Sequence, residues 1–240
     1  MLKIENLCYT APGETGEKEI IKGLSLTLDD RSFAVITGPN GGGKTTLAKL
    51  IMGLEKPTAG RIFWHDQDIT DLSVTERARL GVSYGFQQPP RFKGMTVYDL
   101  LKIASGRDMT RLQCCDYLTR VGLCARDYVD RDMDDSLSGG EAKRIEIATI
   151  LARGGGLMIF DEPEAGIDLW SFSRLTDTFE AIRQSRDATL IVISHQERLI
   201  SLADEIILID GGAVAARGAR DEMLPRIMGQ TVSTCERMEV

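Results

Sequence analysis

The sequence predicts an α/β fold organised around a phosphate-binding loop, and three features support this prediction. Residues 38–45 are Gly-Pro-Asn-Gly-Gly-Gly-Lys-Thr and fit the pattern G-x-x-x-x-G-K-[ST] of nucleotide triphosphatases. The apolar run 33–37 before them is typical of a buried parallel strand. Residues 44–52 after them have the apolar spacing of a helix. Because the motif needs this strand and this helix, a chance match is a poor explanation.

The residue types in the loop suit a triphosphate. Glycines let the backbone approach an anion and adopt positive φ, so that successive N–H groups point at one phosphate. The N-terminus of the next helix adds unpaired donors and a positive dipole end. Lys44 would place a positive charge between the β- and γ-phosphates of a nucleoside triphosphate, and the Thr45 hydroxyl would ligate Mg²⁺. The predicted phosphate-binding residues are Gly38, Pro39, Asn40, Gly41, Gly42, Gly43, Lys44, Thr45 and Thr46.

The composition limits the classes of function. The chain has 240 residues, a hydrophobic fraction of 42% and a net charge of −7. This length allows one large domain with a subdomain, and an acidic chain is a poor candidate for binding nucleic acid. The five cysteines include no C-x-x-C pair. Reduced thiols in a cytoplasm explain them better than disulfides, or than a metal cluster at Cys114, Cys115 and Cys124.

No segment has the features of a membrane anchor. The chain opens on a predicted strand, without the charged and apolar regions of a signal peptide. No apolar run approaches the ~20 residues that cross a bilayer. We therefore expect a cytoplasmic protein with no direct membrane insertion, so that another chain supplies any membrane-spanning part.

Short apolar or alternating runs between turn residues predict the strands. These strands are expected at 2–10, 20–28, 33–37, 61–64, 157–160, 189–193 and 206–209. Glycine, proline and aspartate clusters predict the turns between them. The main turns are expected at 11–18, 29–30, 57–60 and 210–212.

Apolar residues repeated at intervals of three or four predict the helices. These helices are expected at 44–52, 96–103, 112–121, 142–153 and 170–184. Long strand-like runs disappear between residues 88 and 155, which indicates a helical insertion into an α/β core. Residues 231–240 are expected to be a loose polar tail.

Two acidic residues directly follow the apolar run 157–160. Asp161 at the end of such a strand can hold Mg²⁺, usually through water. Glu162 is one residue further on, where a carboxylate can orient an attacking water or take its proton. Strand-end carboxylates that face solvent are the common alternative, but the apolar run before this pair and Pro163 after it favour a site.

His195 follows the apolar run 189–193, and its charge can respond to a phosphate near neutral pH. In an open parallel sheet, ligands bind outside the carboxyl ends of the strands. Gly38, Asp161 and His195 each follow a predicted strand, so we expect them to converge on one γ-phosphate. Without the other two, His195 would be an ordinary loop histidine, as His65 is expected to be.

A second glycine-rich helix start lies at Leu137-Ser138-Gly139-Gly140-Glu141. Such a helix N-terminus can bind an anion, although an ordinary N-cap with a glycine-rich turn is the alternative. A nucleotide on the loop at 38–45 leaves this second anion site without a ligand. A head-to-tail dimer in which each copy caps the other's nucleotide would supply one.

Together these motifs resemble those of the ATP-binding cassette (ABC) ATPases. The four motifs stand in that family's order, and the resemblance covers about residues 2–220. It implies an α/β P-loop NTPase fold with a mixed central sheet, an antiparallel β subdomain and an inserted α-helical subdomain. One domain, 1–240, would comprise a nucleotide-binding core, 1–87 and 156–240, and a helical signature subdomain, 88–155. The implied activity is hydrolysis of ATP to ADP and phosphate, with Mg²⁺.

The resemblance also implies roles for single residues. Gln87 would contact Mg²⁺ and the attacking water, although Gln88 is adjacent, and Tyr9 would stack on adenine unless it is a core or edge tyrosine. The segment 165–168 would meet the partner subunit of an ATP-induced homodimer. The implied catalytic residues are Lys44, Gln87, Glu162 and His195, the metal ligands Thr45, Gln87 and Asp161, and the nucleotide contacts in trans Ser138, Gly139, Gly140 and Glu141.

Within this family the chain most resembles SufC, the ATPase of the Suf iron–sulfur cluster assembly system. The resemblance lies in 139–147, 161–168 and 193–198, where transporter ATPases more often have Gln in place of Ala142-Lys143. It implies a SufB/SufD-like scaffold as partner. The alternative is the ATPase subunit of an ABC transporter, with a permease as partner. The complete set of Lys44, Asp161, Glu162 and His195 argues against a third class, a non-catalytic nucleotide-gated module.

Overall fold

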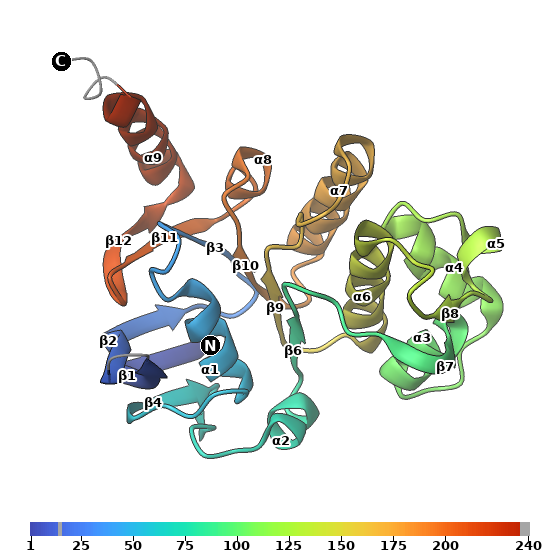
Figure 1. Ribbon diagram of the computed structural model, residues 1–240, viewed down its shortest axis with the longest axis horizontal. Coiled ribbons are helices and arrows are strands. Elements are labelled where there is room, and N and C mark those ends of the chain that lie inside the picture. The colour runs from blue at the N-terminus through green and yellow to red at the C-terminus, as the bar shows by residue number, and fades with distance from the viewer. Residues whose placement is uncertain (14–15, 236–240) are drawn as a thin grey trace.

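The computed structural model describes residues 1–13 and 16–235, with side chains as far as residue 227. In these residues the centre is a six-stranded sheet in the order β12-β11-β3-β10-β9-β6 (Figure 1). Its parallel strands are β6 (Val82–Gly85), β9 (Leu157–Asp161), β10 (Thr189–Ile193), β3 (Phe33–Thr37) and β11 (Glu205–Asp210). Strand β12 (Ala213–Ala219) joins β11 antiparallel, so the sheet is mixed, as expected.

A second, antiparallel sheet lies beside the first. Its order is β2 (Gly16–Leu28), β1 (Leu2–Gly13), β4 (Ala59–Trp64) and β5 (Gln67–Asp68). Helix α1 (Lys44–Met52) lies between the two sheets (Figure 1), and its buried Leu47 and Ile51 share a core with Leu2 and Ile36. This packing fixes the helix that begins at the phosphate-binding loop.

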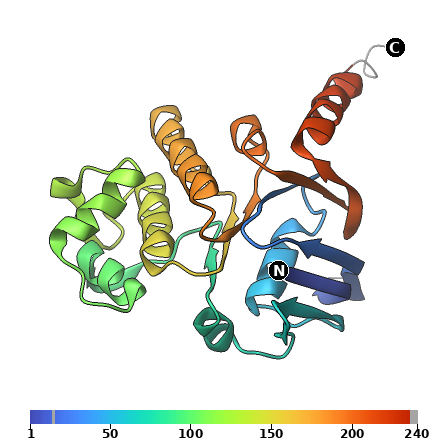
Figure 2. The same ribbon diagram turned by 180° about the vertical axis from the view of Figure 1, so that it is seen from behind.

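Helices α3 to α6 and two short strands form a group that Figure 2 shows on the side of the molecule away from β1 and β2. This group comprises β7 (Phe92–Thr96), α3 (Val97–Ser105), α4 (Arg111–Arg120), α5 (Ala125–Tyr128), β8 (Asp132–Met133) and α6 (Gly139–Arg153). Its buried side chains continue into a core with α7 (Leu169–Ser185) and with β3, β9 and β10. The other helices are α2 (Val74–Arg79), α8 (Glu197–Ile200) and α9 (Arg220–Cys235).

Two boundaries expected from the sequence were wrong. The turn expected at 11–18 is much shorter, because β1 continues to Gly13 and β2 starts at Gly16, with residues 14–15 outside the described part. Residues 10–13 and 16–19 pair in a two-stranded extension whose side chains are mostly exposed. The sequence there therefore has no alternation of apolar and polar residues that would predict a strand. Residues 231–235 of the expected tail lie in α9, and 236–240 lie outside the described residues.

Candidate active site

Three neighbouring strands bring the predicted site residues to one edge of the central sheet. Strand β10 lies between β3 and β9, and Ile193 at its end pairs with Ile36 on one side and with Asp161 on the other. Because all three strands are parallel, their carboxyl ends meet at this edge. The loops that start at Gly38, Glu162 and Ser194 therefore leave the sheet side by side.

The phosphate-binding loop has a backbone that requires glycine. Gly38 has φ 135°, and a Cβ there would lie 2.0 Å from the carbonyl oxygen of Ile209. Gly43, the N-cap of α1, has φ 104°. Lys44 is 6% exposed, and its ammonium donates to the carbonyls of Gly38 at 2.7 Å and Pro39 at 2.8 Å. The loop thus curls around the side chain of Lys44.

A cavity of about 600 Å³ opens in front of this loop. Its lining includes the predicted residues Asn40, Gly41, Gly43, Lys44, Thr45, Thr46, Gln87 and Glu162. Strand β2 adds Lys18 and Lys22, two cations that the sequence did not point to because they lie in a polar strand without a motif. This volume is within the usual range for small-molecule sites, and its lining includes the cations Lys18, Lys22 and Lys44 together with Glu19 and Glu162.

Asp161 is completely buried beneath the loop. Its Oδ1 accepts a hydrogen bond from the Thr45 hydroxyl at 3.2 Å, and its Oδ2 accepts one from the Tyr84 hydroxyl at 3.0 Å. Burial raises the pKa of Asp161, and these two hydrogen bonds oppose the rise. A carboxylate beside a hydroxyl supplies the hard oxygen ligands that Mg²⁺ prefers, so Asp161 and Thr45 fit this ion. Tyr84 was missed because β6 is too short to give a pattern.

Glu162 lies at the turn that follows β9, with φ 48°. A positive φ is uncommon for a residue other than glycine and often marks a functional turn. Its backbone N–H donates to the carbonyl of Ile193 at 2.9 Å, and its side chain accepts from Gln87 Nε2 at 2.8 Å. Gln87 therefore lies at the site, whereas Gln88 does not line the cavity.

His195 lies two residues beyond the end of β10 at the same edge, with an exposed side chain that does not line the phosphate cavity. Although the side chain is exposed, the protein removes part of the water around the ring; this desolvation, and then the charge of Lys44, lower the pKa of His195, while the charge of Glu162 opposes them. The preceding turn is fixed by Ser194, whose hydroxyl donates to Glu164 at 2.5 Å and accepts from the Gln196 N–H at 3.0 Å. The lowered pKa means that the free chain favours the neutral imidazole more than an isolated histidine does.

Tyr9 does not line this cavity, although it pairs with Ile21 of β2, whose neighbours Ile20 and Lys22 do. Its ring packs partly buried against the core shared by α1 and the antiparallel sheet. Its hydroxyl donates to Glu55 at 2.7 Å, and it does not line the phosphate cavity. Stacking of Tyr9 on adenine stays a prediction.

The second glycine-rich segment forms the start of α6. Ser138 is the N-cap, and it exchanges hydrogen bonds with Glu141 in a capping box. A Cβ on Gly140 would lie 2.5 Å from the Gly166 carbonyl, so this position requires glycine. Ser138 and Gly139 are exposed and do not line the phosphate cavity of their own chain. This surface can therefore contact a ligand held by another molecule.

The cysteines do not add a second candidate site within the described residues. Cys8, Cys114, Cys115 and Cys124 are free thiols. Among the described residues, no group of three or more His, Cys, Asp or Glu side chains is placed to hold a metal ion. In the same residues, no helix combines the length and the apolar character that a membrane span requires.

Residues 21–165 match the family model described as ABC transporter. The chain is also 39% identical over 231 residues to an uncharacterized ABC transporter ATP-binding protein of Methanocaldococcus jannaschii, covering 93% of this chain and 90% of the relative. The chain belongs to the ABC transporter family. It is an ATP-binding cassette ATPase, as the order of its motifs indicated.

Other comparisons agree with this membership. An energy-coupling factor transporter ATP-binding protein of Clostridium acetobutylicum is 32% identical over 237 residues, covering 94% of this chain and 82% of the relative. The fold is that of a dimeric ATP-binding cassette solved with ADP and phosphate, with a TM-score of 0.82 at 23% identity, over 92% of this chain and 99% of that one. The named relatives are transporter proteins, so they support the transporter alternative better than the narrower SufC resemblance.

Proposed function

We propose that this chain is the ATP-binding and ATP-hydrolysing subunit of an ABC transporter, working as an ATP-induced homodimer at the cytoplasmic face of the membrane. The observation that carries this proposal is that Lys44 and Glu162 line one cavity beside the buried Asp161. His195 follows the neighbouring strand at the same edge, and its ring interacts electrostatically with Lys44 and Glu162. A triphosphate seated on the loop would place its terminal phosphate among these groups. The membership in the ABC transporter family supports the same function.

The phosphates of ATP would bind to the backbone N–H groups of the loop and to the ammonium of Lys44. The ammonium of Lys44, which donates to the carbonyls of Gly38 and Pro39, would turn toward the bound anion. Thr45 and Asp161 would hold Mg²⁺, which supplies charge neutralisation for the β- and γ-phosphates. The amide oxygen of Gln87 would face the same region, because its nitrogen donates to Glu162.

Hydrolysis would use Glu162 as the group that orients the water. The water oxygen attacks the γ-phosphorus, the bond from that phosphorus to the β,γ-bridging oxygen breaks, and ADP leaves. Glu162 accepts the proton that the water loses, and Gln87 holds the carboxylate in place. His195 would contact a γ-phosphate oxygen from the third strand end.

The second copy would complete the site. Ser138 and Gly139 are exposed at the N-terminus of α6, the positive end of the helix dipole, which favours a bound anion. The solved cassettes with this fold include dimers, one of them bound to ADP and phosphate. We therefore place the segment 138–141 of one copy on the nucleotide of the other.

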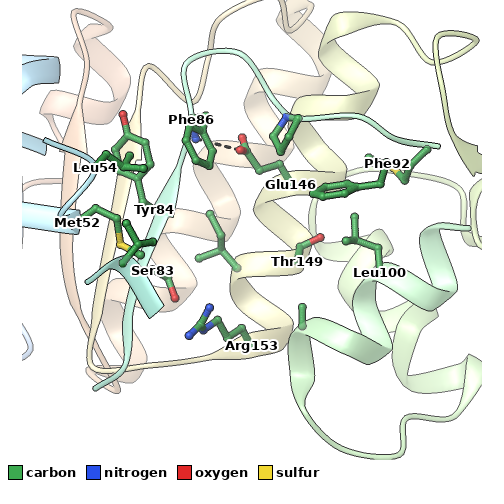
Figure 3. A pocket seen from close by; sticks show the side chains of 15 residues that line it. Met52, Leu54, Ser83, Tyr84, Phe86, Phe92, Leu100, Glu146, Thr149 and Arg153 are labelled. Atoms are coloured by element: carbon green, nitrogen blue, oxygen red, sulfur yellow. Dashed lines mark hydrogen bonds between the residues drawn. The ribbon is translucent and has the colours of Figure 1, made fainter. Parts of the chain in front are cut away.

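An apolar groove of about 290 Å³ offers a place for the membrane partner (Figure 3). Side chains from the core and from the helical group line it, including Met52, Leu54, Tyr84, Phe86, Phe92 and Leu100. Phe86 adjoins Gln87, so a segment that fills this groove touches the chain next to the reaction site. We infer that an apolar segment of the permease docks here.

A second candidate function keeps the same chemistry with a soluble partner. The observation that favours it is Lys143, one of the residues that gave the SufC resemblance, which is buried against the active-site backbone. In this case ATP-driven dimerisation would act on a SufB/SufD-like scaffold for iron–sulfur cluster assembly.

Purification of the tagged chain from its native host, from membranes and from the soluble fraction, distinguishes the two partners. We expect a membrane-spanning permease to co-purify from the membranes. Phe92→Glu in the groove should abolish this association and leave ATP binding intact. Ile103→Glu is the matched control, because Ile103 is an exposed apolar residue of α3 outside the groove. Recovery with a soluble scaffold alone would reject the transporter proposal in favour of the second candidate.

A further inference from the structure

The backbone of Phe86, which precedes Gln87, is held by two charged side chains of α6. The N–H of Phe86 donates to Glu146 Oε1 at 2.9 Å (Figure 3), and the carbonyl of Phe86 accepts from the ammonium of Lys143. Strand β6 ends at Gly85, so Phe86 lies beyond the sheet ladder. These two side chains therefore replace the backbone partners that a neighbouring strand would provide.

Lys143 also reaches the end of β9. Its ammonium donates to the carbonyl of Asp161 at 3.2 Å. One side chain thus ties together the residue before Gln87 and the residue before Glu162. These are the two residues whose side chains meet in the 2.8 Å hydrogen bond at the cavity.

The pair is buried and is balanced in charge. Lys143 is 1% exposed and Glu146 is 8% exposed, and Glu146 Oε2 lies 3.5 Å from the ammonium. Burial lowers the pKa of Lys143 and raises the pKa of Glu146, and the charge of each opposes the change in the other. A buried ion pair adds little net stability, because desolvation offsets its attraction. Its directed hydrogen bonds to the backbone of Phe86 and Asp161 explain its presence better.

We propose that Lys143 and Glu146 are positioning residues for ATP hydrolysis, which hold the backbone of Phe86 and so place Gln87 against Glu162. This inference rests on the roles proposed above for Gln87 and Glu162. Neither Lys143 nor Glu146 lines the phosphate cavity, so the effect is on turnover and not on ATP binding. Lys143 and Glu146 both belong to α6, so a movement of that helix would also move Gln87 and Glu162.

The test measures kcat and KM for ATP hydrolysis with the purified full chain. Lys143→Met removes the donor to both carbonyls, and Glu146→Leu removes the acceptor for the Phe86 N–H. Each should lower kcat by at least about tenfold, as misplaced catalytic groups do, and change KM by less than about threefold. Glu146→Gln keeps an oxygen at the same place and should retain kcat within about threefold. The double variant Lys143→Met/Glu146→Leu should lose no more than about what Lys143→Met loses, because both act through Phe86.

Thr178→Val is the matched structural control. Thr178 lies in α7, does not line the phosphate cavity, and its buried hydroxyl bonds to the carbonyls of Arg120 and Arg174, so its loss should lower stability and leave kcat unchanged. If Lys143→Met and Glu146→Leu retain wild-type kcat while Glu162→Gln is inactive, the positioning role is rejected and the proposed function stands. Wild-type turnover of Glu162→Gln would instead remove the role proposed for Glu162. If Lys143→Met does not fold, equal kcat values of Glu146→Leu and Glu146→Gln reject the inference.

Discussion

The side-chain amide of Gln87 donates a 2.8 Å hydrogen bond to the carboxylate of Glu162. The two residues are 75 positions apart, and they meet because β6 and β9 are neighbouring parallel strands in which Gly85 pairs with Phe160. Each side chain stands two residues beyond its paired strand residue. Sheet register therefore determines which amide faces which carboxylate.

Glu162→Gln should bind ATP and lose at least about 100-fold in turnover, because an amide cannot accept a proton from water at neutral pH. With hydrolysis blocked, the ATP-bound dimer should accumulate and elute as a dimer on a sizing column. Steady-state phosphate release and size-exclusion chromatography in ATP measure the two effects. Turnover equal to that of the wild type would exclude Glu162 as the base.

Lys44→Ala should weaken ATP binding. A charge-assisted contact to a phosphate contributes roughly 2–3 kcal/mol, which corresponds to about a 30- to 150-fold rise in Kd. Lys49→Ala is the control, because Lys49 lies in the same helix outside the phosphate cavity. Titration calorimetry with ATP compares the two, and equal affinities would show that Lys44 does not contact the phosphates.

The titration of His195 should respond to ATP. Burial and Lys44 place its pKa below the usual 6.5 in the free chain, since both disfavour the charged ring. A γ-phosphate beside the ring favours the charged form, so ATP should raise this pKa. The chain has two histidines, so NMR of ¹³C-histidine-labelled Glu162→Gln protein gives two signals. The signal that disappears in the His65→Gln variant belongs to His65, and the remaining signal belongs to His195. A midpoint that ATP leaves unchanged would place His195 away from the γ-phosphate.

The sequence predicted the parts of the site that follow long apolar strands. Strands β3, β9 and β10 are completely buried, so their side chains form continuous apolar runs and their ends are marked by Gly38, Asp161 and Ser194. The rule that ligands bind at the carboxyl ends then brought these loops together. The mixed sheet, the antiparallel sheet and the helical group agree with the family resemblance.

The residues near the site that were not predicted from the sequence lie where no apolar periodicity marks them. Strand β6 has four residues and carries Tyr84, whose importance depends on its register with β9 and not on its neighbours in sequence. Lys143 and Glu146 are charged residues three apart on a helix, a spacing usually found on solvated faces. They are buried only because α6 packs against β6 and β9, a tertiary contact that no local pattern encodes.

Arg77 provides a test of how the phosphate-loop helix is held at its other end. The side chain is 1% exposed and donates to the carbonyls of Leu50 and Ile51 in the last turn of α1. It also donates to the carbonyls of Thr70 and Leu72, so the guanidinium joins the C-terminus of α1 to the segment before α2. A cation at this end of a helix is favoured by the helix dipole.

Arg77→Met should lower the free energy of unfolding by at least about 3 kcal/mol, because it leaves buried carbonyls without donors. Arg77→Lys should recover only part of this loss, since one ammonium cannot reach all the carbonyls that lie around the edge of the guanidinium. Arg79→Met is the matched control: Arg79 lies in the same helix and is exposed, so its loss should cost less than about 0.5 kcal/mol. Urea denaturation of the three variants gives the values. Equal stability of Arg77→Met and Arg79→Met would mean that water replaces the guanidinium at these carbonyls, so that α1 is held by apolar packing alone.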